Sequence, residues 1–172
     1  VFQANSDGAI NTGWIFNDQS VLDASVANAV SGGHQIFLGN SILNALVANA
    51  ISGGTQAFNN SSILNVGATN ALTNATDLSF DNSQSGVGGS VVLNGYSTVI
   101  GRITSIYQGS GLTANNGAAD TVLTVDGTQQ GNSLFSGVIV DSTSTSSGTL
   151  GLRKAGNSTL TLAGNNGYSG GT

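Results

Sequence analysis

The residues of this 172-residue chain that could do acid–base chemistry are eight Asp and a single His, since it contains no Glu and no Cys. Polysaccharide hydrolases and lyases need two carboxylates at a controlled separation. The best candidates for such a cluster are Asp18, Asp23, Asp77 and Asp81. Nothing in their spacing fixes a pair, so the sequence predicts no catalytic residues and a protein that is not an enzyme.

Metal and cofactor sites are equally poorly supported. A transition-metal site needs several His or Cys ligands, and His34 stands alone. The GGxGxD nonapeptide of calcium-binding β-rolls is absent. The glycine pairs at 32–33 and 53–54 are interpreted as turns that need positive φ, not as phosphate cradles. We therefore predict no metal, no cofactor and no cofactor-binding residues.

The composition excludes further classes of function. Only 6% of residues are charged, and the three basic ones are Arg102, Arg153 and Lys154. Three cations cannot follow a phosphate backbone, so nucleic-acid binding is excluded. No apolar run approaches the roughly 18 residues that span a bilayer, which predicts no membrane insertion by this segment. The abundant Ser, Thr, Asn and Gly favour strands and tight turns.

An internal repeat of 21 residues organises the first half of the chain. QSVLDASVANAVSGGHQIFLG, from Gln19, aligns without a gap to NSILNALVANAISGGTQAFNN, from Asn40, and a third copy begins at Ser61. The repeat places several apolar residues in register: Val21, Ile42 and Ile63; Leu22, Leu43 and Leu64; Phe16, Phe37 and Phe58, with Phe80 one residue late. Within a copy, apolar and polar residues alternate as in strands.

Copies of this length cannot bury a face alone, and stacking them would bury their apolar side chains in files. At about 3.3 Å per residue, 21 residues give a contour of roughly 70 Å, which suits one turn of a three-sided coil. The predicted fold is an all-β, right-handed parallel β-helix with about 21 residues per coil and roughly eight coils. We predict one continuous solenoid, regular over residues 1–80 and less regular over 81–172, excised from a longer chain.

The repeat register also interprets the polar residues. Asp18 is equivalent to Gly39 and Asn60, and Asp23 to Asn44 and Asn65, which indicates solvated or corner positions. His34 is equivalent to Thr55 and is expected in a surface turn. A third file is interpreted as a corner ladder of side-chain amides: Asn28, Asn49 and Asn70. Trp14 is interpreted as core or end-cap packing rather than a sugar-binding surface.

The second half offers no further site. The stretch STSTSSGT, residues 142–149, is expected to be a flexible protruding loop, and its hydroxyls lack a partner base. Lys154 is expected to pair with an Asp on a neighbouring coil. The tyrosines form no evident aromatic platform: Tyr96, Tyr107 and Tyr168.

The closing sequence GTLGLRKAGNSTLTLAGNNGYSGGT resembles the passenger-associated transport repeat of autotransporter proteins. The matching residues are Leu152, Lys154, Gly156, Thr159, Leu160, Leu162, Gly164, Asn166, Tyr168, Gly170, Gly171 and Thr172. VLTVDG and FSGVIVD resemble the segments that precede that motif, so residues 78–172 carry the likeness. The resemblance implies a β-helical stalk, export across the outer membrane and a separate C-terminal barrel.

We therefore predict a non-catalytic structural or adhesive stalk segment, located extracellularly or on the bacterial cell surface. Its expected partners are other copies, side by side or end to end (possibly as fibres), or glycans and proteins of host or bacterial surfaces. Two alternatives remain open: a polysaccharide-acting β-helix enzyme, and a secreted toxin or receptor-binding passenger. A purely transport-related role for the closing repeat is a third.

Overall fold

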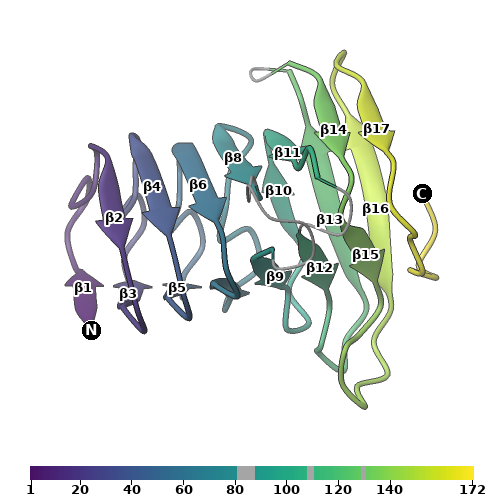
Figure 1. Ribbon diagram of the computed structural model, residues 1–172, viewed down its shortest axis with the longest axis horizontal. Coiled ribbons are helices and arrows are strands. Elements are labelled where there is room, and N and C mark those ends of the chain that lie inside the picture. Colours follow the sequence, from purple (N-terminus) through teal and green to yellow (C-terminus); the bar gives the residue numbers. More distant parts are fainter. Residues whose placement is uncertain (81–87, 108–110, 129–130) are drawn as a thin grey trace.

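The structure is a computed structural model that describes residues 1–80, 88–107, 111–128 and 131–172. The described residues form 17 short strands and no helix. The chain winds so that strands separated by one coil lie side by side, from the N-terminal end to the C-terminal end (Figure 1). No described segment is therefore a helix long and apolar enough to cross a membrane.

One face is a parallel sheet that runs through both halves of the chain. Its seven strands, in spatial order, are β1 (Phe2–Ala4), β3 (Val21–Ala24), β5 (Ile42–Ala45), β7 (Ile63–Val66), β9 (Ser90–Val92), β12 (Leu112–Ala114) and β15 (Val138–Val140). Spatial neighbours in this sheet are never consecutive in sequence, as a solenoid requires.

A second face carries five strands: β2 (Trp14–Phe16), β4 (His34–Phe37), β6 (Gly54–Phe58), β8 (Thr76–Ser79) and β11 (Arg102–Thr104). A single bridge between Ser105 and Phe135 continues it onto the pair β14 (Ser133–Phe135) and β17 (Leu160–Leu162). The third face begins as bridges between Ile10, Val30, Ile51 and Leu72. It later widens into β10 (Thr98–Ile100), β13 (Thr121–Asp126) and β16 (Leu150–Ala155).

The pairing register confirms the predicted fold class, a right-handed parallel β-helix. Leu22 pairs with Leu43 and Leu43 with Leu64, all in parallel strands. All three leucines are fully buried. Copies offset by 21 residues therefore lie directly over one another, as the repeat predicts.

Later coils are longer than the repeat predicts. Ile63 lies opposite Ser90, Ser90 opposite Leu112, and Leu112 opposite Val138, so these steps span 27, 22 and 26 residues. Seven strands in the first sheet define six steps along the rod. The expectation of roughly eight coils was therefore too high, because it extended the 21-residue step to the whole chain.

Aromatic rings form a file inside the solenoid. Phe16, Phe37 and Phe58 stack with ring centroids 4.8 and 5.0 Å apart, close to the spacing between neighbouring strands. Phe80 continues the file at 6.2 Å from Phe58, and Phe135 follows at 5.9 Å from Phe80. All but the first are completely buried. The file makes each coil's packing depend on its two neighbours, as expected for a solenoid.

The turn residues follow from backbone geometry. Asn28, Asn49 and Asn70 all have φ between 54 and 57°, a left-handed conformation that Asn tolerates better than most residues. The backbone N–H of Asn28 donates to the carbonyl of Asn49, and that of Asn49 to Asn70, each at 2.7 Å. The predicted ladder of side-chain amides was thus wrong for this file, because the stack is joined through its main chain.

The predicted role of the glycine pairs is half right. Gly33 and Gly54 have φ of 77 and 78°, whereas the first glycine of each pair does not have positive φ. A Cβ on Gly54 would also lie 2.5 Å from the carbonyl oxygen of Gly33 in the next coil. The second glycine is therefore required by both conformation and space.

Candidate interaction surface

The four candidate carboxylates do not form one cluster. Asp18 lies in an exposed turn with φ of 42°, and its equivalents Gly39 and Asn60 share this left-handed conformation. Asp23 lies on β3, on the seven-stranded face, whereas Asp77 lies on β8, on the five-stranded face. The last candidate, Asp81, lies outside the described residues.

The outer surface of the seven-stranded sheet carries a side-chain amide ladder. Asn44 donates to Asp23 at 2.7 Å, and Asn65 donates to Asn44 at 3.0 Å. The amides bond along the stack because identical positions of successive coils lie about one strand spacing apart. The mixed Asp and Asn file predicted as solvated therefore does form the hydrogen-bonded ladder. The ladder stiffens the first half of the rod.

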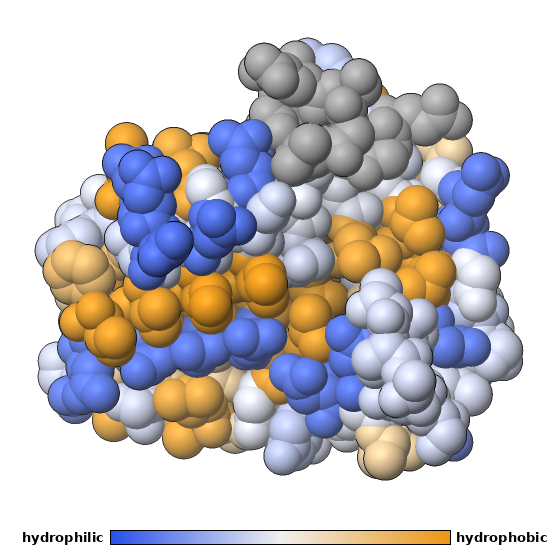
Figure 2. All heavy atoms as spheres, turned by 60° about the horizontal axis from the view of Figure 1, so that its bottom comes forward, coloured by the Kyte–Doolittle hydropathy of each residue, from blue (hydrophilic) through white to orange (hydrophobic). Residues whose placement is uncertain are grey.

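A row of aliphatic side chains runs beside this ladder. Val21, Ile42 and Ile63 pair in register two residues before the ladder positions and are all partly exposed. Side chains two apart on a strand point to the same face. Figure 2, where this face comes forward, shows an apolar row lying beside a hydrophilic row. The combined surface is flat, repetitive and nearly uncharged.

Asp77 is the one carboxylate with chemistry distinct from the rest. It is 4% exposed and accepts a 2.7 Å ion-pair hydrogen bond from Arg102, which lies opposite it on β11. Burial raises the pKa of Asp77, and the attraction and hydrogen bond from Arg102 oppose that rise. Its strand neighbour in the previous coil is Thr55, followed by exposed His34. Asp77 thus has a cationic partner but no carboxylate partner in this file.

The remaining well-defined carboxylates act as structural acceptors. Asp141 accepts from the N–H groups of Leu150 and Ser169 and from the Ser169 hydroxyl, and these bonds lower its pKa. Asp120 accepts twice from Thr149, with the same effect on its pKa. The pKa of Asp126 is likewise lowered, chiefly by hydrogen bonds from Thr128. Such caps hold turns between coils and leave these carboxylates occupied.

His34 and Trp14 lie where neither has a catalytic partner among the described residues. His34 is exposed and opposite Thr55, as the repeat register predicts, but it begins strand β4 rather than lying in a turn. Trp14 packs at the N-terminal end, with its ring stacked 6.3 Å from Phe16. The end-cap interpretation of Trp14 fits this position.

Lys154 does not form its expected ion pair. Its ammonium group donates to the carbonyls of Ala155 and Gly156, and it has no salt bridge with any described carboxylate. Its charge is the smallest of the listed contributions that lower the pKa of Asp126. The prediction of a cross-coil partner is therefore right in sign and wrong in geometry.

The Ser- and Thr-rich loop is held by hydrogen bonds. The Asn116 side-chain oxygen accepts from the Ser142 hydroxyl and from the Thr143 N–H and hydroxyl. The hydroxyls of Ser142, Ser144 and Ser146 contact one another at 3.0 Å. The expectation of a freely protruding loop is replaced by a pinned one, because Asn116 lies one coil below it.

The sequence reasoning missed a second amide ladder inside the rod. Gln35 and Gln56 are completely buried, and Gln56 donates to the Gln35 side-chain oxygen at 2.8 Å. Gln35 in turn donates to the backbone oxygens of Thr12 and Gly32. The signal was present, since both glutamines share parity with the inward Phe37 and Phe58. It was overlooked because Gln is rarely buried.

Among the described residues, no group of three or more His, Asp or Glu side chains could hold a metal ion. The fold and its surfaces define the class of protein as a parallel β-solenoid. No family model, no curated protein and no solved structure matches the chain. The autotransporter resemblance thus stays a prediction from the residues that carry it.

Proposed function

We propose that the chain is a non-catalytic, adhesive stalk segment of a secreted or surface-displayed bacterial protein of the autotransporter type. The observation that carries this proposal is the unbroken seven-stranded sheet, with the Asp23–Asn44–Asn65 ladder and its aliphatic row exposed along one side. A rod of this kind acts through length and repetition and has no need of a pocket.

The mechanism would be multivalent contact. Each coil presents one amide and one aliphatic side chain at the same position, so a glycan or protein surface meets several weak sites held at fixed spacing. Linked weak sites raise the overall avidity far above the affinity of one. Because only 6% of residues are charged, little electrostatic repulsion opposes side-by-side association of rods.

The test is a bead assay with matched variants. Beads coated with the purified chain are settled on bacterial cells, on mammalian cell monolayers and on each other. Asn44→Ser combined with Asn65→Ser should reduce attachment or clumping. Thr55→Ala combined with His34→Ala, on the five-stranded face, should leave both unchanged. If beads with the unaltered chain neither attach nor clump more than albumin-coated beads, the proposal is wrong.

A polysaccharide-acting enzyme is the second candidate, and Asp77 is the observation that favours it. A buried carboxyl with a raised pKa beside an arginine is a feature of some acid–base sites. An activity screen on acidic glycans, with and without Ca²⁺, separates the two functions. Turnover that is lost in Asp77→Asn would establish the enzyme and overturn the stalk.

Two other roles have their own experiments. A toxin or receptor-binding passenger would bind one saturable receptor on cells, which titration of labelled chain would detect. A transport role would reside in the closing repeat. Deleting residues 150–172 within a displaying protein should then lower the amount that reaches the surface, and an unchanged yield would exclude that role.

A further inference from the structure

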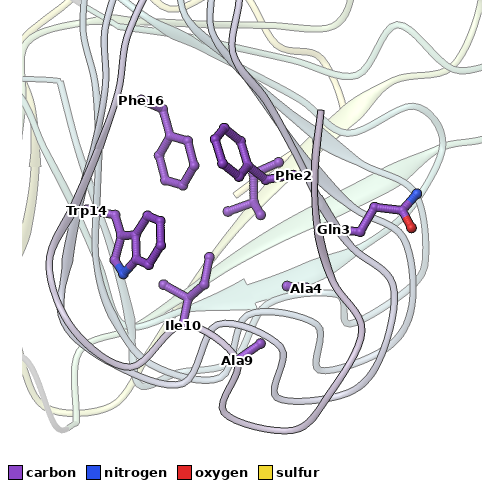
Figure 3. Close-up of a pocket in the computed structure, with 8 residues that line it drawn as sticks. Phe2, Gln3, Ala4, Ala9, Ile10, Trp14 and Phe16 are labelled. Carbon is purple, nitrogen blue, oxygen red and sulfur yellow. The ribbon is translucent and has the colours of Figure 1, made fainter.

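The N-terminal end of the solenoid is an uncovered apolar cross-section. β1 and β2 are the last strands of their sheets, so within the described chain one edge of each has no neighbour. Phe2 and Trp14 are 52 and 45% exposed at this end. They surround a hollow of about 150 Å³, with Ile10 and Phe16 lining its floor (Figure 3).

These two aromatic residues depart from the files they belong to. Phe2 pairs with Leu22, in a file whose next members are Leu43 and Leu64. Trp14 pairs with Gln35, in a file that continues with Gln56. The first coil therefore carries larger aromatic side chains where inner coils carry Leu and Gln. Exposed aromatic residues around a hollow are typical of the central contacts in protein interfaces.

The C-terminal end differs because the closing segment covers it. The N–H of Gly167 donates to Ile139, and that of Gly170 to Leu150, across the edges of β15 and β16. The Asn166 side-chain oxygen accepts from the Ile139 N–H at 2.9 Å. No large apolar side chain beyond Leu134 is exposed among the described residues.

We propose that two copies of this chain associate through their N-terminal ends, with Phe2 and Trp14 of each copy packed against those of the other. The same surface serves both copies, which gives a closed two-fold contact. Edge strands β1 and β2 gain antiparallel neighbours or burial, which removes an edge that otherwise favours uncontrolled pairing. The C-terminal end, already covered, takes no part.

The expected contact is small. A coil with a contour of roughly 70 Å encloses about 230 Å² of backbone cross-section, and the surrounding side chains raise this to about 550 Å² per copy. The total of about 1,100 Å² lies just below the range of standard specific interfaces. The dimer should therefore be weak and should dissociate on dilution. This inference deepens the self-association part of the proposed function and rests on it only there.

Trp14 supplies the readout, because it is the only tryptophan in the chain. With rising concentration of the purified chain, its fluorescence should shift to the blue as sedimentation velocity detects dimers. Phe2→Leu and Trp14→Gln place in the first coil the residues that the same files already contain, so both should fold. Each should weaken dimerisation at least about tenfold. Ile42→Asn, on the side of the rod, is the matched control and should dimerise normally.

Each outcome decides the proposal. A chain that stays monomeric at all concentrations overturns it, as does association that Ile42→Asn abolishes and Trp14→Gln does not. Assemblies longer than dimers in the unaltered chain would indicate head-to-tail stacking and also overturn it. Removing residues 163–172 should convert dimers into longer assemblies, since both ends are then open. A monomeric chain that still coats beads and attaches to cells would overturn this inference and leave the proposed function standing.

Discussion

The side chains of Gln35 and Gln56 hydrogen-bond to each other at 2.8 Å inside the solenoid, where both are fully buried. Gln56→Leu would leave the Gln35 oxygen without its donor in a site that water does not reach. An unmet buried acceptor costs about 1–3 kcal/mol, so the free energy of unfolding should fall by that amount. Urea unfolding of both single variants and the double variant gives the coupling. Strict additivity would contradict a direct interaction.

Adjacent residues on β5 should differ sharply in their contribution to stability. Leu43 points inward and is fully buried, whereas Ile42 points outward and is partly exposed. Leu43→Ala should destabilise the chain by about 2–5 kcal/mol, through lost apolar burial and the cavity left between two coils. Ile42→Ala, removing a side chain of the same size, should cost much less. Equal losses by thermal unfolding would mean that the inward and outward assignments are wrong.

Gly54 should tolerate no side chain. Gly54→Ala meets the Gly33 carbonyl in addition to the strain of φ at 78°. Gly131→Ala is the matched control, because Gly131 has φ of 80° and nothing lies within 4 Å of its added Cβ. The control should lose about 1–2 kcal/mol from backbone strain alone. Gly54→Ala should lose clearly more, and a similar loss in both would exclude the steric effect.

Asp141 should make stability depend on acid pH. Its pKa is lowered in the folded state by hydrogen bonds from Leu150 and Ser169. The unfolded chain therefore binds the proton more readily, so this stability is fully present above the unfolded pKa of about 3.9 and is lost as pH falls through the folded pKa. Asp141→Asn should be less stable at pH 7 and lose less on acidification. Unfolding by urea between pH 7 and pH 2 measures both effects.

Asp77 should act with the opposite sign. Burial raises its folded pKa, so the folded chain binds the proton more readily than the unfolded chain. Its contribution favours folding at low pH and declines as pH rises from the unfolded pKa through the folded pKa. Asp77→Asn should remove this decline while leaving the Asp141 effect in place. A variant whose stability falls as steeply as that of the unaltered chain over this interval would contradict the assignment.

The 21-residue repeat alone predicted the first half of the solenoid, because a fixed step forces equivalent residues into one file. Leu22, Leu43 and Leu64, the Phe file and the pairing of His34 with Thr55 all follow from it. Beyond Leu78 the step varies, and no sequence offset brings Arg102 beside Asp77 or Ser105 beside Phe135. Those contacts depend on how many residues each longer coil places in its corners.

Side-chain ladders also required the tertiary structure. Both the Asn28 file and the Asp23 file repeat every 21 residues, yet only the second bonds through its side chains. Left-handed φ at Asn28 places its peptide in line with the stack, while the extended backbone at Asp23 points its side chain outward beside its neighbours. Periodicity determined which residues meet. Backbone conformation and the covering of each end decided what they do there.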